Sequence, residues 1–422
     1  MRLVYSIIIP VMILGFMLIS AHAALAQESE EPDKKKGGFG GPDQVERQLE
    51  DDEAEKQPFF ELGFLQPYFD FKSNLKERTG LGFGLDYSAA YFGASESLGE
   101  KSAGSGMVRL YGSWDLVGKG ADNTGAFVFK IEHRHKYGAI PVKSLGFELG
   151  YVGMFLPSFS HDEFRMTNFY WRQRFLGGRI SMVIGLLDVT DYADVYGLAS
   201  PWMHFTNFAF STGSQTMFVP NDVNLGVAIG AYITDNIYAI AGINDANSDP
   251  TRPFRSFETF FSENQYFKSV EVGWVSSRER HFFDNIHLLY WHSDGSEFQS
   301  ALPGWGLNFS GTWFFQDKYM PFLRGGYAVD GGSLMQKSVN AGFGWYQAAN
   351  SHLLGAAIGW GEVNESTWGE GLDNQITMEV FYRAQLSSRF AITPTVQYII
   401  NPAMNPNTGS IFVWGIRGRL SL

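Results

Sequence analysis

Residues 410–422, which read SIFVWGIRGRLSL, decide the fold. Phe412, Trp414 and Ile416 occupy every second position, and Arg417 belongs to the alternate set of positions. Strict alternation over this length predicts an extended strand with one apolar face and one mixed or polar face. A water-soluble protein rarely leaves the edge of such a strand open. A membrane barrel pairs its last strand with its first, so we expect this strand to close a barrel.

Similar strand-like runs recur from residue 80 onward, and with the last one they number sixteen. The connections between them nearly alternate between long and short, which is typical of outer-membrane barrels with short periplasmic turns and long extracellular loops. The sequence therefore predicts an all-β fold, a transmembrane antiparallel β-barrel of sixteen strands. A further run at 145–155 would break this alternation, and we place it in a loop. The predicted strands are 80–92, 106–117, 125–136, 165–176, 179–188, 222–233, 237–246, 266–277, 284–294, 305–316, 319–329, 337–348, 352–362, 374–386, 390–400 and 410–422.

Three segments are expected along the chain. Residues 1–26 combine a charged start, an apolar core and an A-x-A site, which indicates a signal peptide cleaved on export to the bacterial outer membrane. Residues 27–60 are highly charged and predict a disordered periplasmic segment with one short helix over 44–56, and a small plug is the alternative. Residues 61–422 form the barrel domain.

Composition narrows the class of protein. The chain has no cysteine, which excludes disulfides and thiolate metal sites. Its formal net charge of -12 argues against a nucleic-acid partner. A mean hydropathy of -0.12 is too polar for a helical membrane protein, whereas barrel strands with one watery face keep this value near neutral. A soluble β-propeller would show a blade repeat, and none is present in the sequence.

The strand predicted over 125–136 shows its two faces most clearly. Phe127 and Ile131 share one parity, while charged residues occupy the other. Each charge would cost about 2–4 kcal/mol in lipid near the midplane, so this face must line a watery lumen. The same alternation selects lumen candidates on the other strands. The predicted pore-lining residues are Lys130, Glu132, Arg134, Arg172, Arg174, Glu271, Glu379, Arg383 and Gln397.

A lumen that mixes charged and aromatic side chains suits sugars. Charged groups form strong hydrogen bonds with hydroxyls, and flat rings pack against the apolar faces of pyranoses. Rings of charge also set pore selectivity. For any single residue, an ion pair within the wall is the alternative interpretation.

The longest connection, 189–221, is rich in aromatic residues. Loops of this length are usually functional or disordered, and the aromatic content favours a loop that folds into the barrel mouth and narrows it. The candidate constriction residues are Asp191, Asp194 and Trp202. The carboxylates around Asp191 could bind calcium, but their spacing is a weak signal, and we expect neither a metal nor a cofactor.

Three blocks of sequence carry a resemblance to a known family. They are NFYWRQRFLGGRISMVIGLLDVTDYAD at 168–194, RLYGSWDLVGKGADNTGAFVFKIEHRHKYG at 109–138 and ITPTVQYIINPAMNP at 392–406. The chain resembles the carbohydrate-selective (OprB-type) porins of bacterial outer membranes over about residues 80–422. The resemblance implies a sixteen-stranded barrel that passes monosaccharides and small oligosaccharides through a constriction with Arg and Glu side chains. Those roles would fall on Glu132, Arg134, Arg172 and Arg174.

Two other functions remain open from the sequence. A general or anion-preferring porin would use the same lumen cations. An outer-membrane barrel hydrolase would need a Ser–His or Asp–His pair at the outer rim, where His161 and His204 lie in predicted loops. We expect a channel and no enzyme, with transported sugars and outer-membrane lipid as partners, and either a monomer or a homotrimer.

Overall fold

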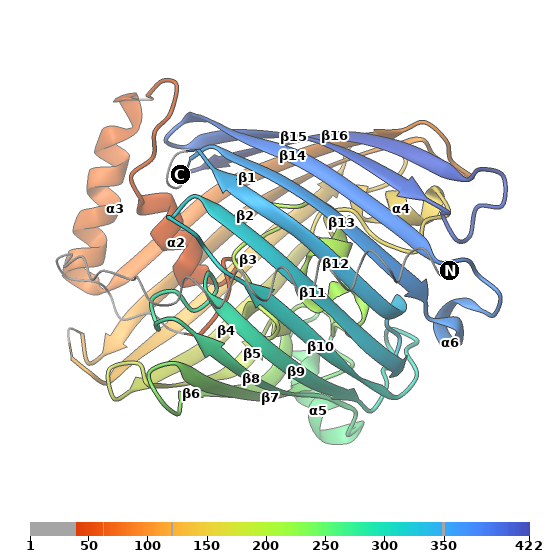
Figure 1. Ribbon diagram of the computed structural model, residues 1–422. Coiled ribbons are helices and arrows are strands. Elements are labelled where there is room, and N and C mark those ends of the chain that lie inside the picture. Colours follow the sequence, from red (N-terminus) through yellow and green to blue (C-terminus); the bar gives the residue numbers. More distant parts are fainter. Residues whose placement is uncertain (1–38, 62, 120, 348–350) are drawn as a thin grey trace. The chain divides into compact units, whose positions relative to one another are not determined.

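The computed structural model describes residues 39–61, 63–119, 121–347 and 351–422. They belong to one compact unit, Lys36–Leu422, whose sixteen strands form a closed barrel (Figure 1). This confirms the predicted fold. The predicted signal peptide at 1–26 and the first part of the segment 27–60 lie outside the described residues, and the three domain boundaries stay predictions.

Every predicted strand is present, with ends that differ by a few residues. The strands are β1 Leu81–Ala94, β2 Ser102–Val117, β3 Thr124–Lys136, β4 Glu163–Phe175, β5 Ile180–Leu187, β6 Asn224–Tyr232, β7 Ile237–Asp245, β8 Tyr266–Val275, β9 Asn285–Ser293, β10 Gly304–Thr312, β11 Tyr319–Asp330, β12 Met335–Tyr346, β13 Leu353–Val363, β14 Gln375–Ser387, β15 Phe390–Ile400 and β16 Ser410–Ser421. Each strand pairs antiparallel with its sequence neighbours.

The barrel closes where the last strand meets the first. β16 pairs antiparallel with β1 in a register that runs from Asp86↔Ser421 to Ala94↔Val413. The expected closure by the final strand is therefore confirmed. Because every strand then has two neighbours, no row of backbone N–H and C=O groups is left unpaired along a sheet edge.

The wall is apolar outside and polar inside. On β16, Phe412, Trp414 and Ile416 are 46%, 47% and 45% exposed, whereas Val413 and Arg417 are 0% and 1% exposed. The arrangement suits a wall whose outer face meets hydrocarbon and whose inner face meets water and folded loops. No helix in the described part of the chain is long and apolar enough to cross a membrane.

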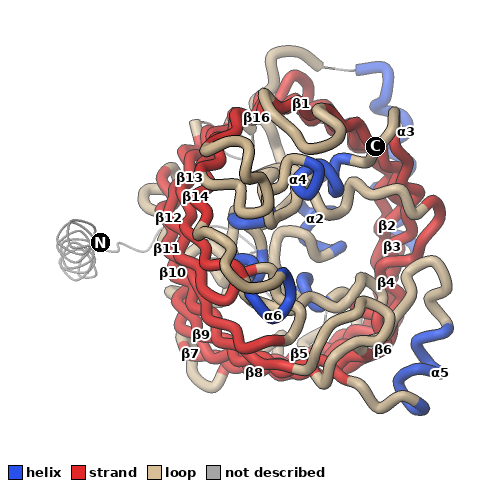
Figure 2. The backbone as a smooth tube through the Cα atoms, turned by 90° about the vertical axis from the view of Figure 1, so that its right-hand side faces the viewer, coloured by secondary structure: helices blue, strands red, loops and turns tan. Residues whose placement is uncertain are grey.

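The long connections fold into the ring of strands (Figure 2). The run 145–155 lies in the β3–β4 connection, as predicted, where it forms the short helix α4 Leu145–Glu148 after the 3-10 turn η2 Val142–Ser144. The β5–β6 connection contains three further 3-10 turns. These are η3 Val189–Asp191, η4 Phe208–Phe210 and η5 Thr212–Gln215.

Within residues 39–80 that the structure describes, two helices precede the barrel. α2 Val45–Glu53 lies inside the ring of strands (Figure 2), with Val45 and Gln48 buried, and it falls within the predicted helix 44–56. This helix packs against lumen-facing residues, and the disorder predicted for the segment 27–60 stays a prediction. After the turn η1 Gly63–Leu65, α3 Gln66–Thr79 stays exposed beside β1 and ends at Gly80, whose φ of 80° suits a glycine cap.

Candidate functional site

A cavity of about 730 Å³, here called the vestibule, lies among the long connections. Its size falls within the range of about 300–1,000 Å³ that is usual for small-molecule sites. Four aromatic side chains line it: Trp202, Phe208, Phe218 and Phe298. Seven carboxylates and five cationic side chains share the same surface, which gives a formal net charge of -2. The vestibule thus combines flat apolar faces with hydrogen-bonding groups of both signs.

One wall of the vestibule is an ion-pair network that begins on β3. The Arg134 guanidinium donates to Glu132 at 2.7 Å and to Asp222 at 2.9 Å. Arg165 on β4 pairs with the same Asp222 at 2.9 Å and with Asp162 at 2.5 Å. The strand supplies two lumen-facing charges because alternate residues point inward, and the connections supply the partners.

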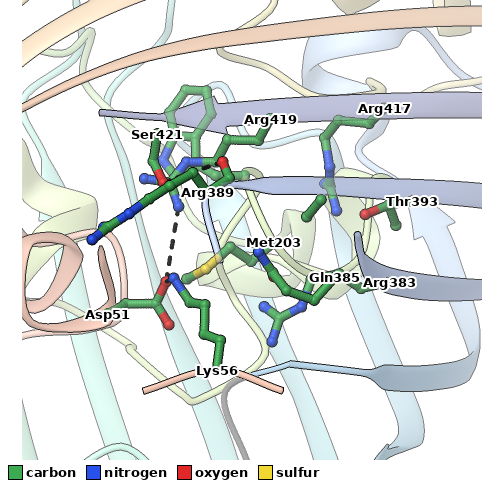
Figure 3. A pocket seen from close by; sticks show the side chains of 12 residues that line it. Asp51, Lys56, Met203, Arg383, Gln385, Arg389, Thr393, Arg417, Arg419 and Ser421 are labelled. Carbon is green, nitrogen blue, oxygen red and sulfur yellow. Dashed lines mark hydrogen bonds and ion pairs between the residues drawn. The ribbon is translucent and has the colours of Figure 1, made fainter. Parts of the chain in front are cut away.

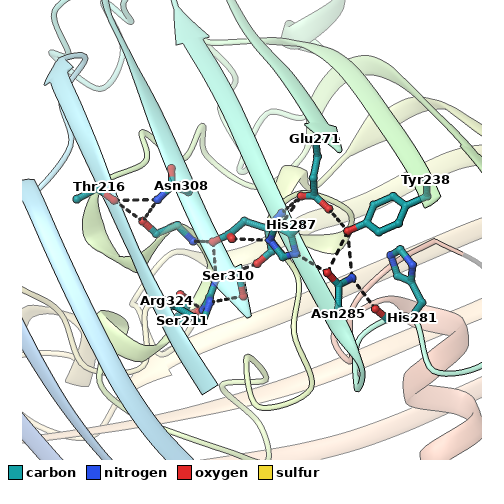
Figure 4. A network of polar contacts seen from close by, with 12 residues as sticks. Ser211, Thr216, Tyr238, Glu271, His281, Asn285, His287, Asn308, Ser310 and Arg324 are labelled. Atoms are coloured by element: carbon teal, nitrogen blue, oxygen red, sulfur yellow. Dashed lines mark hydrogen bonds and ion pairs between the residues drawn. The ribbon is translucent and has the colours of Figure 1, made fainter. Parts of the chain in front are cut away.

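The constriction loop, residues 189–221, is buried across the lumen and tied to the wall at several places; Arg417 of β16, for example, donates to the carbonyls of Pro201 and His204. Two of the attachments involve a buried carboxylate. The first is Asp194, which forms an ion pair with Arg324 of β11. Its other oxygen lies 2.8 Å from Nε2 of His287 on β9. The Arg324 guanidinium also donates to the carbonyl oxygen of Ser211 at 2.8 Å (Figure 4), so one wall arginine binds both arms of the loop.

The hydrogen bonds around His287 define its protonation. The amide nitrogen of Asn285 donates to the carbonyl of His281 at 2.6 Å, which turns the amide oxygen toward His287 Nδ1, 2.8 Å away. Both ring nitrogens therefore face acceptors, and His287 is an imidazolium that balances the buried Asp194 carboxylate. Glu271 completes the cluster by accepting the backbone N–H of Asp194 at 2.7 Å.

The second attachment is made by strands β14 and β15. Glu379 accepts the backbone N–H groups of Thr206 and Asn207, each at 2.8 Å. Gln397 accepts from the Asn207 side chain at 2.9 Å and donates to the Thr206 hydroxyl at 2.8 Å. Burying a carboxylate is costly unless hydrogen bonds compensate for its lost hydration, and here two backbone donors do so. Glu379 and Gln397 therefore position the loop.

Trp202 lies between the vestibule and a second, smaller pocket, because it lines both. Its ring stacks 3.7 Å from the guanidinium carbon of Arg109. The inner pocket (Figure 3) has five cationic side chains and one carboxylate, for a formal net charge of +4. The cations are Lys56, Arg383, Arg389, Arg417 and Arg419, and the carboxylate is Asp51. The two compartments thus carry formal charges of opposite sign.

Helix α2, which precedes the barrel in the chain, also pairs with lumen-facing residues of the strands. Its Glu46 pairs with Arg172 and, at 3.1 Å, with Arg174, both on β4. One turn and a half later, Asp52 accepts from Arg419 at 2.9 Å and from the Tyr111 hydroxyl. Matched charges let a highly charged helix lie in the lumen. α2 therefore occupies space inside the ring of strands.

The predicted lumen residues all face the interior, but they have different surroundings. Those that line the vestibule are Lys130, Glu132, Arg134, Asp191 and Trp202. Those that hold the constriction loop are Asp194, Glu271, Glu379 and Gln397. Those that pair with α2 are Arg172 and Arg174. Arg383 lines the inner pocket. The loop lies inside the ring of strands, and the narrowing of the barrel mouth and the transport roles of these residues stay predictions.

Several important side chains were absent from the predicted set. Arg324, Arg417 and Arg419 occupy inward positions of β11 and β16, where the alternation rule would have found them. Asp222 and Arg165 are different, because the irregular connections that bring them together carry no periodic signal. No group of three or more acidic or histidine side chains in the described residues could hold a metal ion.

We expect Asp191 to make the ion selectivity of the channel depend on pH. Burial raises the pKa of its carboxyl to about 8, although nearby Lys130 opposes the shift. Between pH 7 and pH 9 the group loses its proton, so we expect the channel to gain preference for cations. Reversal potentials under a KCl gradient should move accordingly in the unmodified protein and stay nearly constant in Asp191→Asn. An equal pH-dependent movement in both proteins would contradict the assignment.

The comparisons with known proteins agree with this geometry. A closed sixteen-stranded barrel with a loop across its lumen defines the class of diffusion porins. Residues 69–302 and 322–422 match the family "Carbohydrate-selective porin, OprB family", and the chain belongs to that family. It is therefore an outer-membrane porin through which carbohydrates diffuse, and family and fold indicate a channel rather than an enzyme.

Two solved structures show the same fold. "High pH structure of Pseudomonas putida OprB" is 12% identical with a TM-score of 0.65, and the match covers 84% of this chain and 97% of that chain. A mutant of Rh. blastica porin is 11% identical with a TM-score of 0.52, over 81% of this chain and 100% of that chain. A comparison with curated proteins finds no match.

Proposed function

We propose that sugars cross this porin by binding in the vestibule and then passing Trp202 into the inner pocket. The observation that carries the proposal is the position of Trp202, which borders both compartments. Its indole N–H is buried and has no hydrogen-bond partner among the described residues. Trp202 is only 5% exposed and Arg109 covers one ring face, so the constriction loop would have to move before a pyranose could pack on the other face and accept that hydrogen bond.

The polar groups around the ring would provide the remaining contacts. Glu132 and Arg134 present ionised oxygen and nitrogen atoms on one side of the vestibule, and charge-assisted bonds to hydroxyls are strong. The inner pocket has a volume of about 20 Å³, so it would have to widen before Arg383 and Arg417 could meet the solute. Arg383 already donates to the Ser351 carbonyl, and Arg417 to the carbonyls of Pro201 and His204, which a hydroxyl-rich solute would have to replace.

Replacing Trp202 tests the path. Trp202→Ala removes a stacking contact of about 1 kcal/mol, so we expect about fivefold weaker block of the channel by sugars. Trp202→Phe keeps a flat ring and should retain most of the block. Single-channel current in planar bilayers, with sugars added one at a time, measures both. Sugar block unchanged in Trp202→Ala would contradict the proposed path.

A second candidate function is an anion-preferring pore, favoured by the +4 formal charge of the inner pocket. In that case chloride would permeate more readily than potassium, and sugars would leave the current unaffected. Reversal potentials and sugar titrations on the same channels separate the two functions. Export by the predicted signal peptide and assembly into a homotrimer stay predictions.

A further inference from the structure

Helix α5, Arg255–Ser262, has its polar face turned toward the protein and its apolar face turned away. Ser256 and Thr259 are buried and donate hydrogen bonds to the Asp245 carboxylate at the end of β7. The Ser256 hydroxyl also accepts the backbone N–H of Leu225 at 2.8 Å. A helix on a soluble surface would have the opposite arrangement.

The outward face carries three phenylalanines and one charged residue, Glu258, which is also exposed. Phe254, just before the helix, is 61% exposed, and Phe257 and Phe261 are 47% and 72% exposed. These three rings lie close together on one side of a helix fixed to the barrel by its hydroxyls. An apolar cluster held in this way requires an apolar environment.

α5 lies where the barrel wall is short. β5, β6 and β7 have 8, 9 and 9 residues, whereas β2 has 16. A tilted strand of nine residues spans about 20 Å along the membrane normal, less than the apolar band of about 25 Å that an outer-membrane barrel presents. The helix stands outside the ring of strands, beside β6 (Figure 2).

The phenylalanines continue the lipid-facing surface of the wall. The ring of Phe254 packs against that of Phe169, with centroids 6.4 Å apart and the planes nearly perpendicular. Phe169 is one of the outward-facing residues of β4 and is itself exposed. The β7–β8 connection that contains α5 is one of the long external ones, so α5 extends this surface toward the external side.

We propose that α5 is an interfacial anchor whose Phe254, Phe257 and Phe261 insert into the acyl chains of the outer leaflet. The helix would restore the height of the apolar band over the short strands. Arg255 at its start would lie at the level of the lipid headgroups, where its charge suits phosphate. The partner is lipid, and a second copy of the chain is the competing occupant.

The absence of cysteine from the sequence makes a direct test simple, because one introduced cysteine takes a single nitroxide label. Phe257→Cys reports on the helix, Phe412→Cys on the lipid-facing wall, and Phe298→Cys on the water-filled vestibule. Each labelled full-length protein is reconstituted in vesicles of phosphatidylethanolamine and phosphatidylglycerol. The measured quantities are collision rates with oxygen, which concentrates in lipid, and with a water-soluble nickel chelate.

We expect the label at 257 to collide more often with oxygen than with the nickel chelate, as the label at 412 should, but at a shallower depth in the membrane. Preference for the nickel chelate, as at 298, would place α5 in water and overturn the proposal. Dipolar broadening that disappears on dilution with unlabelled protein would identify a second copy as the partner and would also overturn it.

Folding of each variant is checked by the change in electrophoretic mobility on heating and by channel conductance. If Phe257→Cys does not fold, Phe261→Cys supplies the same measurement from the next turn. The triple variant Phe254→Ser, Phe257→Ser and Phe261→Ser should keep wild-type conductance, because none of these side chains lines a lumen compartment.

Discussion

Deleting residues 39–57 is expected to raise the single-channel conductance several-fold. This segment contains α2, which lies inside the ring of strands and contributes Asp51 and Lys56 to the inner pocket. Without it, ions meet a wider passage inside the ring of strands. The measurement is current through single channels in planar bilayers at fixed KCl concentration, compared with the unmodified protein.

Point substitutions show whether α2 blocks the pore or only supports the barrel. Glu46→Ala removes the partner of Arg172 and Arg174, and breaking a buried ion pair of this kind costs about 3–5 kcal/mol. We expect frequent openings to the high-conductance state. Arg172→Ala with Arg174→Ala should act in the same way, and combining all three changes should add little. A deletion variant that folds but conducts like the unmodified protein would show that α2 does not limit the flow.

Replacing Asp194 by Asn is expected to release the constriction loop from the wall. The substitution leaves Arg324 and the His287 imidazolium buried without their carboxylate, at a cost of about 3–5 kcal/mol. We expect a larger and noisier conductance together with loss of sugar block, because the loop carries Trp202. Planar-bilayer recordings measure both effects. Stability is measured as the temperature at which the folded form, recognised by its different electrophoretic mobility, is lost.

Asp249→Asn is the matched control for that experiment. Asp249 also lies at the vestibule, but its partner Arg252 is largely exposed, so its loss should change stability by less than about 1 kcal/mol. Quiet channels with normal sugar block in Asp194→Asn would mean that the other attachments, through Glu379 and Arg417, hold the loop without Asp194.

The barrel could be predicted from the sequence because its signal is periodic. Alternation in residues such as Phe412, Trp414 and Ile416 reports the outward face of a strand without knowledge of any partner. The alternating lengths of the connections then set the strand count. The same rule placed Lys130, Glu132 and the other lumen candidates on the correct face.

The surroundings of those candidates could not be predicted in the same way. Parity shows that Glu379 points inward, but its hydrogen bonds to Thr206 and Asn207 depend on the path of an irregular loop. The prediction of disorder around α2 has a related cause. The many charges of this segment indicate solvation when read alone, yet Glu46 and Asp52 meet arginines from strands far away in the sequence.

Arg419 connects the pairing of β1 with β16, which closes the barrel, to the position of α2 in the lumen. From β16 it donates to Asp86 of β1 at 2.8 Å and to Asp52 of α2 at 2.9 Å, while Asp86 also binds Arg109 of β2. The seam between the chain's two most distant strands and the helix in the lumen thus share one cation. Closing the seam completes the site that receives the helix, and the seated helix stabilises the seam. The stability of the seam and the position of the helix in the lumen are therefore coupled through this cation.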